Sequence, residues 1–78
     1  EKIALYEKSI MELEDVRGVK EIKGRNYGNN EVIDIVIYVN SSLNIQEAHD
    51  IATLVEKELT KKFGVYNVHV HVEPYTVD

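Results

Sequence analysis

Hydrophobic residues recur along the first sixteen positions with the spacing of one face of a helix. They stand at relative positions i, i+3, i+7 and i+10, and they are Ile3, Tyr6, Ile10 and Leu13. This spacing forms a single apolar stripe on an α-helix, and charged residues fill the positions between. The pattern predicts a helix over residues 2–16, and glycine at position 18 is the expected stop signal.

The middle of the chain changes to patterns that are typical of strands. Residues 32–40, VIDIVIYVN, are rich in β-branched side chains and predict a strand. A weaker strand is predicted over 19–27, and YGNN at 27–30 predicts a tight turn because Gly and Asn tolerate positive φ. Alternation divides 32–40 into two faces. The face expected to meet the helices carries Ile33, Ile35, Ile37 and Val39, and the other carries Val32, Asp34, Val36 and Tyr38.

A second helix and a third strand complete the predicted order. Asn44 and Glu47 have the spacing of a capping box at the start of this helix, and Gly64 is expected to end it. Residues 66–73 predict the last strand, with Pro74 ending it. The order is then α-β-β-α-β. Because a helix joins the second and third strands, these two are expected to be parallel in a three-stranded mixed sheet. The second strand is expected at its centre and both helices on one face.

Length and composition limit the classes of function. A chain of 78 residues predicts a single domain over 1–78, and dimerisation commonly stabilises so small a core. Nine Lys and Arg stand against fourteen Asp and Glu, a net charge of −5. This balance favours cations and argues against nucleic acid or anionic membrane surfaces as partners. The longest apolar run has eight residues, far short of a membrane span.

Motifs for catalysis are missing from the sequence. It has no cysteine, which excludes disulfides, catalytic thiols and thiolate metal sites. It also has no Gly-rich phosphate loop, nucleophile elbow or HExxH motif. An enzyme is therefore not expected.

The stretch VHVHVEP at 68–74 contains two of the three histidines. Alternation predicts that its three valines face the core and that His69, His71 and Glu73 share the open face, where Asp34 also lies if the strands are neighbours. Residues two apart on a strand are separated by roughly 6.6 Å, and residues four apart by about 13 Å. One ion is therefore reachable by His71 with either His69 or Glu73. Imidazole and carboxylate together suit Zn²⁺ and other divalent transition metals.

Simpler interpretations remain open for each of these residues. Alternating His and Val is also typical of a solvated strand, and Asp34 is also explained as a charge on an exposed face. His49 stands at the edge of the second helix's apolar stripe, where it could border the sheet or meet a partner chain. A lone helical histidine more often caps or packs than binds metal.

Taken together, these segments resemble the C-terminal cytoplasmic domain of cation diffusion facilitator transporters. The resemblance covers nearly the whole chain, and its most specific parts are SLNIQEAHDIATLVEKEL at 42–59 and VHVHVEP at 68–74. It implies an α+β, metallochaperone-like two-layer fold, a relative of the ferredoxin-like fold. It also implies a V-shaped homodimer at the cytoplasmic face of the cell membrane. Such transporters export Zn²⁺, Fe²⁺, Mn²⁺, Co²⁺ or similar ions, usually in exchange for protons.

The resemblance also implies roles for particular residues. The family's helix histidine falls on His49, its last-strand histidine on His71, and the acidic residue that follows on Glu73. Some members carry a histidine where this chain has Val36, and Asp34 could substitute for it from the same face. His69 is an additional candidate without a reliable counterpart in the family.

These observations lead to one main hypothesis and two alternatives. The chain is expected to be the regulatory and dimerisation domain of a Zn-type efflux antiporter, whose own transmembrane domain is absent from this chain. A bound ion would stabilise the closed dimer, with His71 as central ligand and His49, Glu73, His69 and Asp34 as further candidates. The alternatives are a structural dimerisation module that binds no metal and a free-standing soluble metallochaperone.

Overall fold

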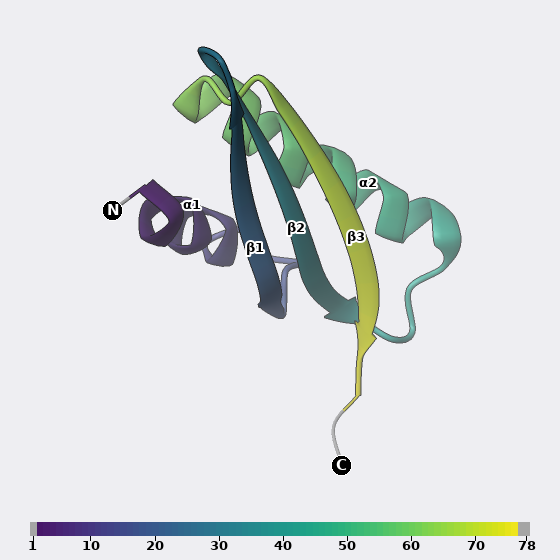
Figure 1. Cartoon of the computed structure of the whole chain (residues 1–78). Helices are drawn as coiled ribbons and strands as arrows, with labels where there is room; N and C mark the ends of the chain where they lie inside the picture. Colours follow the sequence, from purple (N-terminus) through teal and green to yellow (C-terminus); the bar gives the residue numbers. More distant parts are fainter. Residues whose placement is uncertain (1, 77–78) are drawn as a thin grey trace.

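The computed structural model describes residues 2–76 and has two layers (Figure 1). One layer is a three-stranded sheet with the order β1-β2-β3, and the other contains two helices that cover one face of it. The predicted α+β class, the mixed sheet and the central position of β2 are confirmed. The elements are α1 (Lys2–Met11), β1 (Gly18–Tyr27), β2 (Asn30–Asn40), α2 (Ile45–Lys57), the π-helical turn η1 (Glu58–Lys62) and β3 (Asn67–Tyr75).

The core lies between the sheet and the helices, and the inward face of β2 forms its centre. Ile33, Ile35 and Ile37 have no exposed surface, and the stripe continues to Val39 at 3% exposure. The buried residues packed around them from the other elements are Tyr6, Ile10, Val16, Ile51, Val55, Leu59, Val65 and Val68. The predicted division of β2 into an inward and an outward face is therefore confirmed.

Strand pairing fixes which residues are neighbours on the open face. β1 and β2 form an antiparallel hairpin whose turn contains Gly28 with φ of 65°, a conformation that favours glycine. β3 runs parallel to β2 after the α2 crossover, as predicted. Its register places Asp34 opposite His69, and Val36 opposite His71.

The first helix is shorter than the sequence pattern predicts. α1 ends at Met11, and residues 12–15 form turns. The N–H groups of Leu13 and Val16 each bond to the carbonyl three residues earlier, so the chain tightens. This tighter path still brings Val16 into the core, which explains why the apolar period continues beyond the helix. Gly18 begins β1 and does not act as the stop signal.

The second helix begins as predicted, and the last strand runs further than predicted. Asn44 and Glu47 form a complete capping box at the start of α2. The helical segment ends before Gly64, whose φ of 71° is a left-handed conformation. The prediction that Pro74 ends the last strand is wrong. Pro74 lies inside β3, which continues to Tyr75. β3 is an edge strand, where a residue without an N–H is tolerated. Among residues 2–76 no helix has the length and apolar character needed to cross a membrane.

Candidate functional site

The outward faces of β2 and β3 carry four of the five candidate ligands. Alternation along β3 buries Val68 and leaves the His69 and His71 side chains exposed on the opposite face. Asp34 is half-buried on the adjacent strand. The predicted collection of imidazoles and carboxylates on the open face of the sheet is thus present.

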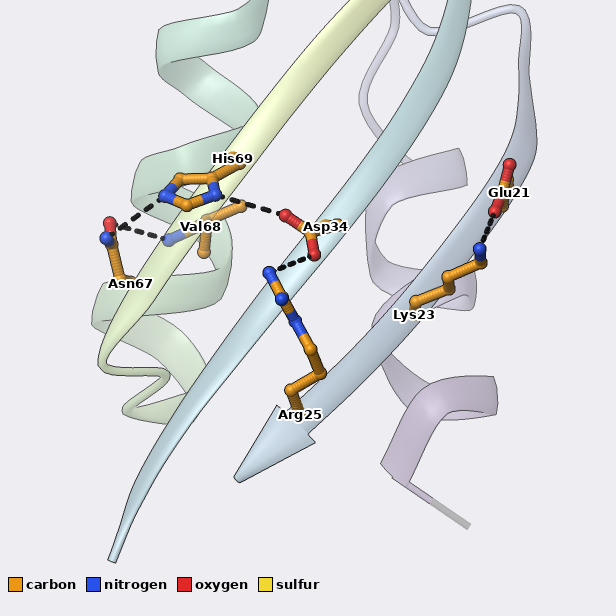
Figure 2. A network of polar contacts seen from close by, with 7 residues as sticks. All are labelled: Glu21, Lys23, Arg25, Asp34, Asn67, Val68 and His69. Atoms are coloured by element: carbon orange, nitrogen blue, oxygen red, sulfur yellow. Dashed lines mark hydrogen bonds and ion pairs between the residues drawn. The ribbon is translucent and has the colours of Figure 1, made fainter. Parts of the chain in front are cut away.

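The closest approach between candidate ligands joins Asp34 and His69. The Asp34 Oδ1 atom lies 3.1 Å from His69 Nδ1 (Figure 2). On the other side of the ring, His69 Nε2 lies 3.3 Å from the Asn67 side-chain nitrogen. The parallel register creates this pair, because the two residues are direct partners across β2 and β3.

His71 and Glu73 are placed differently from this pair. His71 has the hydrophobic Val36 as its neighbour on β2. Glu73 binds Lys20 of β1, whose Nζ lies 3.0 and 3.2 Å from the two carboxylate oxygens. That hydrogen bond and the negative charge raise the pKa of Lys20. Glu73 is therefore already neutralised by a neighbouring cation.

His49 lies in the other layer of the molecule. It is exposed on α2, which covers the opposite face of the sheet (Figure 1). The sheet thus separates His49 from the Asp34–His69 pair within one chain. Among the residues that the structure describes, no three His, Cys, Asp or Glu side chains are grouped closely enough to hold an ion. One chain contributes two adjacent donors, and any further ligands must come from water or from another chain.

Arg25 is a residue of this face that the sequence analysis missed. Its guanidinium Nη2 lies 2.6 Å from Asp34 Oδ2, so Asp34 has a partner on each carboxylate oxygen (Figure 2). Arg25 comes from β1, one of the two neighbours of β2. The pairing follows from the hairpin register, which brings residues near 25 beside residues near 34.

A small hollow lies apart from this face. Its volume is about 150 Å³, and it lies where β2 and β3 end beside the start of α2. Its lining consists of apolar, amide and hydroxyl side chains, including Leu43, Ile45 and Val72. These groups lack the acid–base character that catalysis of proton transfer requires.

Comparison with known proteins identifies the family. A family model described as "Cation efflux protein, cytoplasmic domain" matches residues 1–75. The chain belongs to this family. The resemblance found in the sequence is thereby confirmed, and it extends over both helices and all three strands of this cation efflux domain.

Several relatives of this cation efflux domain are longer proteins. The manganese efflux system protein MneS of Bacillus subtilis (strain 168) is 36% identical over 72 residues, 92% of this chain and 25% of the relative. MneP of the same organism is 30% identical over 76 residues, 96% of this chain and 26% of the relative. The magnetosome protein MamB of Magnetospira sp. (strain QH-2) is 35% identical over 63 residues, 80% and 22% respectively. The chain spans about a quarter of these relatives.

Solved structures share the fold of this cation efflux domain. A variant of the MamM CTD superposes with a TM-score of 0.89 at 23% identity, covering 95% of this chain and 93% of that one. A zinc form of another MamM CTD variant has a TM-score of 0.89 at 21% identity, covering 96% and 84%. At this level of identity the likeness establishes the fold.

Proposed function

We propose that this chain is the cytoplasmic regulatory and dimerisation domain of a divalent-cation efflux transporter, in which Asp34 and His69 bind the regulatory ion. The observation that carries the proposal is the 3.1 Å contact between the Asp34 carboxylate and the His69 imidazole on an exposed face. Family membership supports the transporter assignment.

The chemistry of the two donors suits a transition-metal ion. A carboxylate and a neutral imidazole are common ligands of Zn²⁺ and related ions, and both side chains here remain accessible to solvent. In the present contact His69 Nδ1 donates its proton to the Asp34 carboxylate, and an ion would bind the Nδ1 lone pair that is left once this proton has moved away. The ion would supply the positive charge that holds these two groups together, in place of a shared proton.

The number of donors supports a homodimer. Transition metals in proteins take four or more ligands, whereas one chain offers two on this face. A second copy would supply two more, and the matched family model is itself named for a dimer. Each copy carries a net charge of −5, so an ion between two copies would also reduce their repulsion. Closure of the dimer is then an equilibrium that metal binding shifts.

The choice of ion draws on the relatives. Two of them are named as manganese efflux proteins, and variants of the MamM CTD are described as zinc and nickel forms. A divalent transition-metal ion agrees with both, and Mn²⁺ is the first ion to test. The Zn-type preference expected from the sequence has no support in these manganese relatives.

The remainder of the transporter would lie outside this chain. Because the chain spans about a quarter of its relatives, the membrane-embedded transport pathway is assigned to the other three quarters of such a protein. The domain would then be attached at the cytoplasmic face of the membrane, with its own transmembrane domain as a partner. His71, Glu73 and His49 stay predictions for further ligands, His49 from the facing subunit.

Isothermal titration calorimetry of the 78-residue chain with MnCl₂ and ZnCl₂ tests the proposal. Asp34→Asn and His69→Ala are each expected to weaken binding at least about tenfold, since each removes a ligand. His71→Ala measures the contribution of His71 as a further ligand, and a site centred on Asp34 and His69 predicts a smaller loss for it than for either of these two variants. Equal affinities for the wild type and Asp34→Asn would refute the site, and a large loss only in His71→Ala would move its centre to His71.

A structural dimerisation module without metal is the second candidate. The observation in its favour is that Arg25 and His69 already satisfy both oxygens of Asp34. This candidate predicts that sedimentation velocity gives the same dimer fraction with EDTA as with added MnCl₂. The metal-binding proposal predicts a larger dimer fraction with MnCl₂.

A further inference from the structure

The Asp34 carboxylate carries a resident cation on the side away from His69. Arg25 Nη2 lies 2.6 Å from Oδ2, and His69 Nδ1 lies 3.1 Å from Oδ1 (Figure 2). The Arg25 contact is the shorter, slightly below the usual range for charge-assisted N–H···O hydrogen bonds. Asp34 therefore has no oxygen without a donor in this state.

The pairing of Asp34 with Arg25 is selective among the cations of β1. Lys23 is the direct register partner of Asp34 across the hairpin. Its Nζ nevertheless binds Glu21 at 2.8 Å, and this contact lowers the pKa of Glu21. Arg25 is the register partner of Val32 and reaches Asp34 diagonally. Its reach and its planar donor group suit a carboxylate better than an ammonium does.

A second contact offers the Arg25 side chain an alternative position. Its guanidinium carbon lies 5.9 Å from the centre of the Tyr27 ring on the same strand. A cation near an aromatic face is weakly stabilised at an exposed site. A guanidinium that leaves Asp34 therefore keeps a favourable neighbour in addition to water.

We propose that Arg25 is the counter-ion that a divalent cation must displace from Asp34, so that it sets the affinity of the site. This inference rests on the function proposed above. The incoming ion takes both oxygens of Asp34, Oδ1 beside His69 and Oδ2, which now accepts from Arg25, and the guanidinium moves to water and the Tyr27 face. The guanidinium stays charged at all physiological pH values, so the competition does not depend on its titration.

Displacement of Arg25 should have a measurable effect on the affinity for metal ions. Every divalent ion displaces the same Arg25 guanidinium. Removing this guanidinium should therefore strengthen the binding of every divalent ion by the same factor. For a partly exposed ion pair that factor is roughly three- to tenfold at low salt. Salt screens charges at this exposure, so wild type and variant should converge as ionic strength rises. Among the residues that the structure describes, Asp34 is the carboxylate that pairs with Arg25, so the effect of Arg25 should vanish when Asp34 is replaced.

Calorimetric titration of Arg25→Gln with MnCl₂ and with ZnCl₂ tests the proposal, and Lys23→Gln is the matched control. Both substitutions remove one positive charge from β1, but of these two residues Arg25 forms the ion pair with Asp34, whereas Lys23 pairs with Glu21. The proposal expects Arg25→Gln to tighten binding of both ions by a similar factor of about three to ten, and Lys23→Gln to tighten it by less than about twofold. In an Asp34→Asn background, Arg25→Gln should have no effect.

The possible outcomes separate this proposal from the proposed function. If the wild type binds metal and Arg25→Gln binds it no more tightly, the counter-ion role is wrong and the metal site stands. If Arg25→Gln and Lys23→Gln tighten binding equally, general charge accounts for the effect and the specific role of Arg25 is wrong. Binding by Arg25→Gln alone would support the counter-ion role and refute metal binding by the wild type. No binding by either would refute both.

Discussion

Replacing Ile35 by Ala tests which face of β2 forms the core, on which the position of the metal site depends. Ile35 is fully buried at the centre of the strand, between the sheet and the helices. The adjacent residue, Val36, is half-buried on the open face beside His71. Val36→Ala is the matched control, because both changes replace a β-branched residue with Ala at neighbouring positions of one strand.

The buried position sets the size of the expected effect. Ile35→Ala removes three carbon atoms from a site with no exposed surface, which costs about 3 kcal/mol of unfolding free energy when the cavity is included. A domain of this length has roughly 4–12 kcal/mol in total. At about 4–8 °C per kcal/mol, the midpoint of thermal unfolding should fall by roughly 12–24 °C. Val36→Ala should cost about 1 kcal/mol or less.

Urea and thermal unfolding followed by circular dichroism provide the measurement. Dilute protein and EDTA are needed, because dimerisation or bound metal would add stability that depends on concentration. A Val36→Ala loss equal to or larger than the Ile35→Ala loss would refute the assignment of the two faces. The outward position of Asp34 would then lose its basis as well.

Two further predictions concern parts of the fold that support this face. Asn44→Ala should lower the unfolding free energy by about 1 kcal/mol, because Asn44 caps α2 through the Glu47 N–H; an unchanged urea midpoint would contradict this role of the cap. Burial, together with the hydrogen bond to Glu31, raises the pKa of Tyr6 to about 12. The folded state therefore holds this proton more tightly than the unfolded state, so the associated stability is complete below pH 10 and is lost as the pH rises towards 12. Tyr6→Phe should reduce the alkaline loss of stability measured in urea between pH 9 and 11, and an identical slope in both proteins would contradict this.

Alternation alone predicted which residues share the open face, but it could not predict which of them touch. A one-residue slip of β3 would turn its histidines inward, and the buried Val68 excludes it. A two-residue slip keeps every side chain on the same face. It would place His71 opposite Asp34, where the register of the structure has His69. The length and packing of the α2 crossover decide between these registers, and no local pattern encodes them.

The ends of elements also depended on contacts distant in sequence. The apolar period through Leu13 predicted a longer helix, yet the Arg17 N–H bonds to the Tyr38 carbonyl at 2.8 Å and draws the chain towards the sheet. A cluster of acidic residues after Met11 disfavours a helix C-terminus and was a usable local signal. The pairing of Arg25 with Asp34 followed from the hairpin register, which the turn residues alone do not determine.

Anomalous scattering from crystals of the chain grown with MnCl₂ is the decisive test of metal binding by Asp34 and His69, because it locates and identifies the ion together. We expect one anomalous peak bonded to an Asp34 carboxylate oxygen and a His69 ring nitrogen at about 2.0–2.3 Å, with the Arg25 guanidinium displaced. A peak elsewhere on the molecule, with Arg25 still bound to Asp34, would contradict it.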